Sequence, residues 1–229
     1  MRYICDINNN KYKNLRLCRA ELCDYGKVFS FLDDCRNALD KIEFFYPYTQ
    51  SELEAVLDKG YFMCAMEGDE IVATCAVDRD EEYARQLADV IKKGSGGKED
   101  VGLAYEASGL MVRADRRGAG LASYMLSKAV EYADDQKINL CGVVFYTNKA
   151  SIATFFGRKF LLSAIFEPIN GYKFVYLLKK FNFCYSKPEL YGKIEITEAE
   201  ELNTALQKGF QGFGLDGDSL LVSEIGRKA

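Results

Sequence analysis

An apolar strand that runs directly into a glycine-containing turn and a helix most constrains how this chain can fold. Residues 110–133 read LMVRADRRGAGLASYMLSKAVEYA. The first residues are apolar, and apolar side chains then recur at helical spacing at positions 121, 125, 129 and 133. The basic, glycine-bearing turn lies between these two patterns. The segment therefore predicts a strand, a tight turn and an amphipathic helix in direct succession.

Such a junction can bind phosphate. A turn that opens a helix aims free backbone N–H groups at one point, and the helix dipole favours an anion there. Gly118 and Gly120 let the backbone approach a ligand closely, and Arg117 adds a charged donor. The turn lacks the Lys-Ser/Thr pair of a P-loop and the spacing of a dinucleotide-binding GxGxxG loop. An ordinary helix start remains the alternative interpretation of the turn by itself.

Composition limits the classes of protein to consider. The 229 residues suit one large domain, or one domain with an appendage, and a hydrophobic fraction of 48% supports a core. No apolar run approaches the ~18 residues of a membrane span, and the polar first residues do not resemble a signal peptide. A net charge of −4 argues against non-specific nucleic-acid binding. We therefore expect no membrane or nucleic-acid partner.

The cysteines and the absence of histidine bear on location and chemistry. Eight cysteines are scattered along the chain without a CxxC pair, which predicts reduced core thiols in a cytoplasmic protein. There is no histidine, so Ser-His-Asp and Cys-His catalysis and histidine-based metal sites are excluded. We expect no metal, and any proton transfer must use a carboxylate, Tyr, Lys, Cys or water.

The order of predicted elements indicates an α/β fold, with a mixed sheet and helices on both faces. A polar arm over residues 1–14 precedes it, and a tail over residues 181–229 follows it. A capping box at Ser51 and Glu54 marks the second helix, and residues 80–100 form an insertion of undecided role. The predicted strands cover residues 15–20, 61–66, 71–77, 103–112, 139–146, 161–166 and 172–178, and the predicted helices cover residues 21–40, 51–60, 80–93, 121–136 and 148–157.

The string from Arg117 to Ala122 resembles motif A of the GNAT N-acetyltransferase superfamily, Arg/Gln-x-x-Gly-x-Gly/Ala, and the preceding Leu110-x-Val112 is similar to that family's apolar strand. A second resemblance, to motif B, runs from Asn148 through Ser151 to Phe160. The resemblance covers residues 15–180. It implies a mostly antiparallel twisted sheet with helices on both faces, and residues 181–229 are a small C-terminal extension outside it.

The resemblance implies that acetyl-CoA is the co-substrate. The turn would hold its pyrophosphate, the strand edge would pair with the pantetheine amides, and the start of motif B would contact pantetheine. The implied cofactor-binding residues are Leu110, Met111, Val112, Arg117, Gly118, Ala119, Gly120, Leu121, Ala122, Asn148, Ser151 and Phe155.

Motif B departs from the family pattern at two positions. Phe155 stands where many relatives have a tyrosine that protonates the departing thiolate, and Lys159 stands where glycine precedes the final phenylalanine. Because phenylalanine has no proton to give, water or another tyrosine would act as the acid. The candidates nearest in sequence are Tyr146, Tyr124 and Tyr172.

Glu106 is the candidate general base. It lies on the strand before motif A, where several GNAT enzymes carry a catalytic glutamate, and a carboxyl in an apolar strand can have a raised pKa. A surface or ion-paired glutamate is the alternative. Glu43, Tyr46 and Tyr48 are candidates for binding a cationic acceptor, with burial in the core as the alternative for the tyrosines.

These residues predict an N-acetyltransferase that moves an acetyl group from acetyl-CoA to a primary amine by direct attack. The acceptor, a small molecule or a peptide, is left open, and so is a homodimer, which is frequent in the family. One alternative is a catalytically silent GNAT-fold protein that binds coenzyme A as a sensor or interaction module. Another is a nucleotide-phosphate binder unrelated to coenzyme A.

Overall fold

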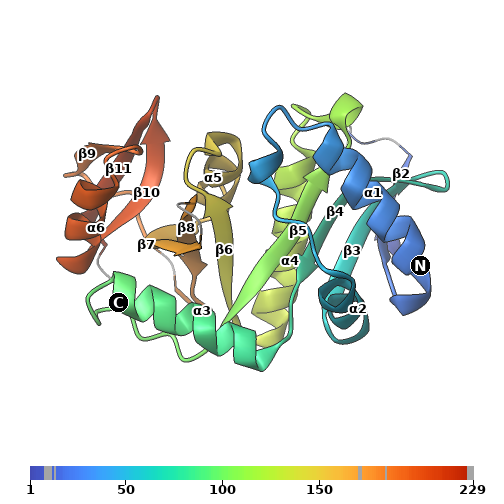
Figure 1. The fold of residues 1–229 in the computed structure, drawn as a ribbon, viewed down its shortest axis with the longest axis horizontal. Helices are drawn as coiled ribbons and strands as arrows, with labels where there is room; N and C mark the ends of the chain where they lie inside the picture. The colour runs from blue at the N-terminus through green and yellow to red at the C-terminus, as the bar shows by residue number, and fades with distance from the viewer. Residues whose placement is uncertain (8–11, 13, 170–171, 184, 226–229) are drawn as a thin grey trace. The chain divides into compact units, whose positions relative to one another are not determined.

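The computed structural model describes residues 1–7, 12, 14–169, 172–183 and 185–225. The chain divides into two compact units (Figure 1). Unit 1 comprises Met1–Asp80 and Ala107–Glu131, and unit 2 comprises Glu81–Glu106 and Tyr132–Ala229. Strand β5 (Ala104–Val112) and helix α4 (Leu121–Gln136) each contribute residues to both units. Each unit is described by itself.

Unit 1 is built on an antiparallel sheet in which each strand pairs with the next along the chain. The strands are β1 (Arg2–Asp6), β2 (Leu15–Arg19), β3 (Tyr61–Glu67), β4 (Glu70–Val77) and the last part of β5. β1 lies within the segment predicted to be a polar arm, where the sequence indicated no strand. The strand is largely exposed and held by its pairing with β2, which explains why it gave no apolar pattern.

Both faces of the unit 1 sheet are covered. Alternate residues of β3 point to opposite faces, and Phe62, Met63 and Cys64 are all fully buried. On one face, α1 (Tyr25–Asn37) and α2 (Gln50–Lys59) pack against Phe62 and Cys64. Figure 1 shows α4 behind β5.

Two details at the starts of the unit 1 helices differ from the prediction. The predicted helix over residues 21–40 is a short 3₁₀ turn, Leu22–Asp24, followed by α1. The capping box of α2 is formed by Thr49 and Glu52 instead of Ser51 and Glu54. Both pairs have the three-residue spacing of a capping box, so spacing alone could not choose between them.

The sheet of unit 2 starts with the first residues of β5, which pair in parallel with β6 (Asn139–Phe145). The remaining pairings are antiparallel and run β6–β8–β7–β10–β11–β9. These strands are β7 (Leu161–Ile169), β8 (Tyr172–Lys179), β9 (Gly192–Glu195), β10 (Phe210–Asp216) and β11 (Ser219–Glu224). The C-terminal extension thus continues the sheet of unit 2 through β10, where Gly212 lies opposite Leu162. Residues 170–171 of the predicted β7–β8 turn lie outside the described residues.

Three helices belong to unit 2: α3 (Glu81–Gly94), α5 (Lys149–Phe156) and α6 (Ala199–Gln207). α3 covers the region predicted to be an insertion. Its residues Leu87, Ala88 and Ile91 are buried in one cluster with residues of β6, β7 and β8. A Cβ on Gly94 would lie 2.5 Å from the Cβ of Ala164, so the end of α3 is packed directly on β7. α3 is therefore part of the core of unit 2.

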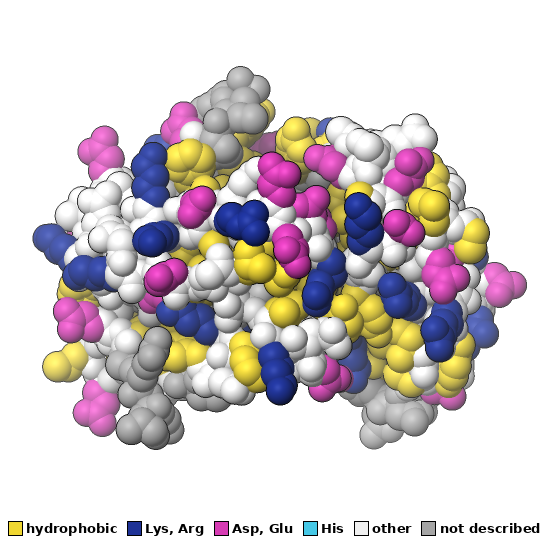
Figure 2. Space-filling model, turned by 90° about the horizontal axis from the view of Figure 1, so that it is seen from below, with side chains coloured by type: hydrophobic (Ala, Val, Ile, Leu, Met, Phe, Trp, Pro, Cys, Tyr) yellow, Lys and Arg dark blue, Asp and Glu magenta, His cyan; other side chains and the backbone are white. Residues whose placement is uncertain are grey.

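Figure 2 shows lysine and arginine side chains interspersed with aspartate and glutamate on one face of the molecule. Among the residues drawn in colour there, the basic side chains do not gather into one continuous surface. Within the described part of the chain, no helix is both long and apolar enough to cross a membrane.

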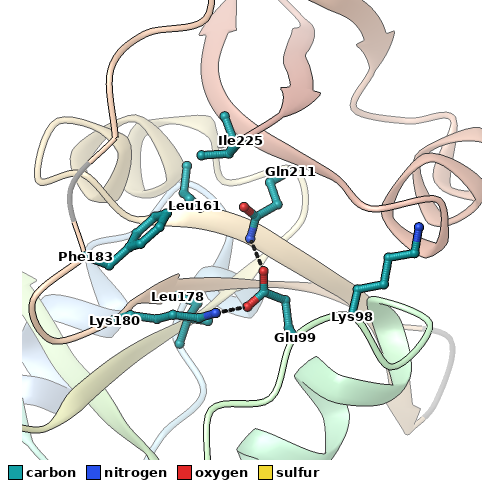
Figure 3. Close-up of a pocket in the computed structure, with 8 residues that line it drawn as sticks. All are labelled: Lys98, Glu99, Leu161, Leu178, Lys180, Phe183, Gln211 and Ile225. Carbon is teal, nitrogen blue, oxygen red and sulfur yellow. Dashed lines mark hydrogen bonds and ion pairs between the residues drawn. The ribbon is translucent and has the colours of Figure 1, made fainter. Parts of the chain in front are cut away.

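Unit 2 contains a cavity of about 130 Å³ beside the C-terminal extension (Figure 3). Its walls combine an apolar part with a charged and polar part. The lining residues are Lys98, Glu99, Leu161, Leu178, Lys180, Phe183, Gln211 and Ile225.

Candidate functional site

β5 carries a bulge just before motif A. Thr74 of β4 pairs with Met111 and Ala76 pairs with Ser108, so two β5 residues, Gly109 and Leu110, lie opposite a single β4 residue. Gly109 has a φ of +57°, which a residue with a side chain rarely adopts. The hydroxyl of Thr74 donates a 2.7 Å hydrogen bond to the Gly109 carbonyl oxygen. A bulge interrupts the ladder and redirects backbone groups, and bulges are frequent next to active sites.

The aromatic loop predicted to bind the acceptor reaches this bulge through one residue. A Cβ on Gly109 would lie 3.0 Å from the Tyr48 hydroxyl oxygen, so Tyr48 lies directly against the bulge. For the other two candidates, Tyr46 and Glu43, the structure gives no contact with the bulge among the described residues. Tyr46 is 77% exposed, and Glu43 is half-buried in the short 3₁₀ turn Ile42–Phe44.

The predicted turn connects β5 to α4 as expected. A 3₁₀ turn, Ala114–Arg116, leads into Gly118 and Gly120, whose φ angles are +77° and +86°. α4 then begins at Leu121, whose side chain is buried and anchors the helix start in unit 1. The first turn of α4 carries no acidic side chain to occupy its N-terminal amides. These amides and the dipole of the helix therefore form a potential site for an anion.

The side chain of Arg117 has a different task from the one expected. Its guanidinium donates to the carbonyl oxygens of Val112 at 3.1 Å, Ala38 at 3.0 Å and Cys35 at 3.3 Å. Cys35 lies in the last turn of α1, and Ala38 is that helix's C-cap residue. A cation there satisfies carbonyls that the helix leaves unpaired. Arg117 thus ties the turn to α1 through three of the five N–H donors of its guanidinium.

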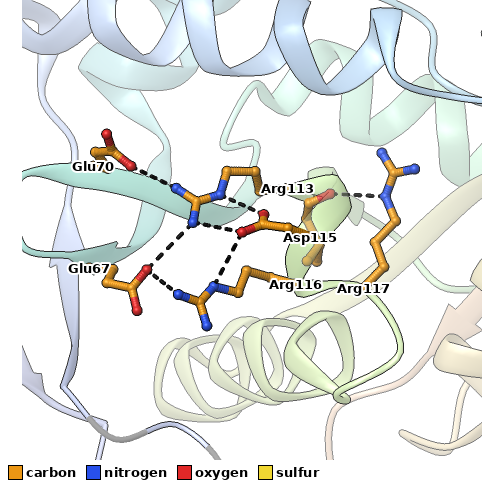
Figure 4. A network of polar contacts seen from close by, with 7 residues as sticks. Glu67, Glu70, Arg113, Asp115, Arg116 and Arg117 are labelled. Atoms are coloured by element: carbon orange, nitrogen blue, oxygen red, sulfur yellow. Dashed lines mark hydrogen bonds and ion pairs between the residues drawn. The ribbon is translucent and has the colours of Figure 1, made fainter.

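The two arginines just before the motif, Arg113 and Arg116, also bind acidic side chains of the protein (Figure 4). Arg113 donates to Glu70 at 2.8 Å and to Asp115 at 2.7 Å, and Arg116 pairs with Glu67. The hydrogen bond from Arg113 lowers the pKa of Asp115. Glu67 and Glu70 lie at the β3–β4 hairpin. The network therefore connects the hairpin to the segment that leads into the turn. Its carboxylates neutralise the positive charges of Arg113 and Arg116.

Tyr12 contacts the turn from the N-terminal segment. Its hydroxyl donates a 2.7 Å hydrogen bond to the Ala119 carbonyl oxygen, and its ring lies 5.9 Å from that of Tyr124 in α4. The side chain is 7% exposed. Sequence reasoning missed this residue because it lies in a polar, Asn- and Lys-rich stretch.

The predicted base lies in unit 2 within a polar cluster. Glu106 is half-buried and pairs across the sheet with Cys141. The hydroxyl of Tyr83 in α3 is hydrogen-bonded to Glu106, and the negative charge of that carboxylate, followed by burial, raises the pKa of Tyr83. Burial, followed by the Glu106 charge, raises the pKa of the Cys141 thiol. Tyr83 thus stays protonated as a donor to Glu106, and Cys141 stays a thiol. The helix that supplies Tyr83 had no predicted role.

The residues of motif B in unit 2 have mainly structural contacts. Asn148 is the N-cap of α5, and its side-chain oxygen accepts a 3.2 Å hydrogen bond from the Ser151 backbone N–H. Phe155 is 2% exposed, and its ring lies 4.9 Å from that of Phe160. A Cβ on Gly142 would lie 2.2 Å from the Phe155 ring, so this aromatic side chain fills the core over β6.

Tyr146, the candidate acid, follows the end of β6. Its backbone N–H donates to the Lys173 carbonyl oxygen at 3.1 Å. Its ring lies 5.5 Å from that of Phe145, which also contacts Tyr172 at 5.7 Å. Two of the three tyrosines considered for the acid therefore belong to one aromatic cluster of unit 2. The described residues hold no group of three or more His, Cys, Asp or Glu side chains suited to a metal ion.

Comparisons with known proteins indicate the family of the chain. The model of the Acetyltransferase (GNAT) family matches residues 27–158, which is more than half of the chain. The sequence has no significant match among curated proteins.

The fold is similar to those of solved acetyltransferases. A GNAT-family acetyltransferase from Streptococcus pneumoniae is 16% identical with a TM-score of 0.54, covering 73% of this chain and 99% of that one. The acetyltransferase YncA from Salmonella typhimurium, solved with its cofactor acetyl-CoA, is 11% identical with a TM-score of 0.55, covering 78% and 100%. NAA60 from Arabidopsis thaliana, in complex with a bisubstrate analogue, is 15% identical with a TM-score of 0.56, covering 73% and 98%.

Proposed function

The chain belongs to the GNAT acetyltransferase family, and from this we propose that it transfers an acetyl group from acetyl-CoA to a primary amine by direct attack. The observation that carries the proposal is the succession in unit 1 of the β5 bulge, the Gly118–Gly120 turn and an acid-free helix start. A relative of the same fold was solved with acetyl-CoA, which supports the choice of co-substrate.

In this proposal the backbone holds the pyrophosphate. The amides of the turn and of the first turn of α4 donate to the phosphate oxygens, and the helix dipole favours their charge. Arg117 supports the turn from behind, through its bonds to Val112, Ala38 and Cys35. The edge formed by Leu110, Met111 and Val112 receives the pantetheine amides, as a short added strand would be received.

The transfer itself forms one bond and breaks another. The amine nitrogen attacks the thioester carbonyl carbon, a C–N bond forms, and the C–S bond breaks as the thiolate leaves. Backbone N–H groups released by the bulge at Gly109 and Leu110 stabilise the oxyanion that develops. Tyr48, which lies against Gly109, lines the acceptor side of this point.

We assign Glu106 the role of proton acceptor, directly or through water. Its carboxylate accepts a hydrogen bond from Tyr83, which holds it in one orientation. Phe155 has no hydroxyl, so the leaving thiolate takes its proton from water or from Tyr146. The acceptor is a small-molecule or peptide amine.

One observation favours a second candidate function. Phe155 is packed in the core over Gly142, so the position where many relatives carry the acid is filled by a structural side chain. A chain with this change suits a protein that binds coenzyme A without turning it over, acting as a sensor. Both candidates share the coenzyme A site and differ in turnover.

A substitution at the start of α4 tests the site. Ala122 is the second residue of α4, where a glutamate is favourable to the helix but competes with a bound anion. We expect Ala122→Glu to lose at least tenfold in acetyl-CoA affinity by isothermal titration, with an unfolding midpoint no lower than that of wild type. The neutral isostere Ala122→Gln should bind like wild type. ATP is the control ligand. Equal affinities for the two variants would refute the placement.

Turnover separates the two candidate functions. Wild type and Glu106→Gln are incubated with acetyl-CoA and a panel of small amines and peptide N-termini, and release of the coenzyme A thiol is followed. Transfer that falls by two orders of magnitude or more in Glu106→Gln supports the enzyme and its base. Binding without transfer over the whole panel supports the sensor.

A further inference from the structure

The cavity of unit 2 combines a half-buried ion pair with an apolar wall (Figure 3). Lys180 and Glu99 form an ion pair, and their side chains are only 20% and 16% exposed. Gln211, which is 7% exposed, donates from its amide nitrogen to Glu99 at 3.0 Å and to the Ser163 hydroxyl at 3.2 Å. Taking both charges out of water is costly, and a pair of well-packed apolar residues of similar volume is often at least as stable. The pair therefore calls for a role besides packing.

Lys180 and Glu99 do not use all of their hydrogen-bond donors and acceptors on each other. A carboxylate has about four acceptor sites, and an ammonium has three N–H donors. In the described part of the chain, Glu99 accepts from Lys180 and Gln211. Lys180 uses one N–H donor on Glu99, and its ammonium nitrogen also lies 6.0 Å from the centroid of the Phe183 ring. The cavity thus offers spare acceptors on an anion beside spare donors on a cation. A ligand that carries both an ammonium and a carboxylate matches this arrangement without any change in net charge.

The volume and the remaining walls narrow the ligand further. Leu161, Leu178, Phe183 and Ile225 line the apolar side. A closed apolar cavity of about 150 Å³ accommodates a benzene molecule. The cavity of unit 2 has a volume of about 130 Å³ and is partly open to solvent, so it suits a ligand of about the size of benzene or slightly larger. An α-amino acid with a small branched side chain, of about eight non-hydrogen atoms, satisfies both limits.

We propose that this cavity binds a small apolar α-amino acid such as valine, with its carboxylate on Lys180, its ammonium on Glu99 and its side chain on the apolar wall. The site is distinct from motif B in the same unit. Lys179 pairs with Leu140 at the start of β6, whereas Asn148 follows the opposite end of that strand. The seven residues of β6 separate the two ends by about 20 Å at about 3.3 Å per residue.

The ligand would join parts of the chain that are far apart in sequence. Glu99 follows α3, Lys180 follows β8, and Gln211 lies on β10 of the C-terminal extension. An amino acid held by the first two would rest against Ile225 at the end of the described extension. The proposal gives the extension a ligand-binding role that is independent of acetyl transfer.

Thermal unfolding of the full-length protein tests the proposal with matched ligands. We expect 10 mM L-valine to raise Tm by about 3 °C or more, as a Kd of about 1 mM or tighter would require. Isovalerate, which lacks only the amine, and isobutylamine, which lacks only the carboxylate, should each give less than a third of that shift. L-tryptophan should give none because its side chain is too large. Two results would overturn the proposal. One is the absence of a Tm shift with valine, which would mean that the cavity holds only water. The other is an equal Tm shift with isovalerate or isobutylamine.

Two lysines of the lining serve as variant and control. Lys180 faces Glu99, whereas Lys98 extends away from that pair and donates to the Lys208 carbonyl oxygen (Figure 3). Lys180→Met should abolish the valine shift, and Lys98→Met should keep it. Lys180→Met leaves the Glu99 carboxylate without a cationic partner and can fail to fold. The second variant is therefore Ile225→Phe, which adds volume to the cavity wall and leaves both residues of the ion pair in place. Its valine affinity should fall at least tenfold, and a full response would contradict the assignment.

Discussion

Replacement of Arg117 distinguishes a residue that supports the turn from one that binds phosphate. The guanidinium donates to three carbonyl oxygens, two of them at the end of α1. The side chain is exposed, so each hydrogen bond is taken at the low end of the usual range, about 0.5 kcal/mol. Loss of a cation at a helix C-terminus adds about 0.3–0.5 kcal/mol. We therefore expect Arg117→Met to lower the free energy of unfolding by about 2 kcal/mol.

The measurement is urea unfolding alongside acetyl-CoA titration. Arg117→Lys keeps the charge but cannot reach three carbonyls with its single ammonium, so it should lose about 1 kcal/mol. Acetyl-CoA affinity should change by less than about threefold in both variants, because the phosphate donors are backbone amides. If stability stays at the wild-type value while affinity falls by tenfold or more in Arg117→Met, Arg117 binds phosphate and the reasoning fails.

Two further predictions concern backbone conformation and buried charge. Lys159 has a φ of +66°, a backbone conformation that glycine adopts more readily than residues with a side chain. Lys159→Gly should therefore raise the free energy of unfolding, measured in urea, by about 0.5–1 kcal/mol, whereas Lys159→Ala should leave it unchanged. A lower free energy of unfolding in Lys159→Gly would contradict this prediction. Burial raises the pKa of Asp78, and a raised carboxyl pKa means that its contribution to stability is present at low pH and is lost as pH rises through the folded-state value. Asp78→Asn should therefore be more stable than wild type at pH 7, with the difference shrinking toward pH 4, and a pH-independent difference would refute the assignment.

Local patterns in the sequence predicted the elements that position the candidate site. The hairpin of β3 and β4, the strand β5 and the helix α4 follow from apolar periodicity and turn residues, and the structure confirms them. β1, β9 and β10 were not predicted, because short strands of polar or glycine-rich composition lack that periodicity. β1 is held by pairing with β2, β9 pairs with β11, and β10 pairs with β11 and with the more distant β7.

In the candidate site, too, the sequence predicted the local features but not the contacts between distant parts of the chain. Gly118 and Gly120 could be identified from sequence because few residues other than glycine tolerate that backbone conformation. The three acceptors of Arg117, the contact of Tyr48 with Gly109 and the bond from Tyr83 to Glu106 depend on tertiary packing. A glycine at position 109 inside a strand pattern was the one available signal for the bulge.

The contact between Tyr12 and Ala119 has a practical consequence for handling the protein. Shortening the chain so that it starts at Leu15, the first residue of β2, would remove Tyr12 together with β1. The Ala119 carbonyl would lose its partner, and the edge of β2 would present unpaired backbone groups to other molecules, as edges prone to aggregation do. If a protein trimmed in this way precipitates or binds acetyl-CoA poorly, the loss of its first residues is therefore the first explanation to test, before any change in the chemistry of the turn.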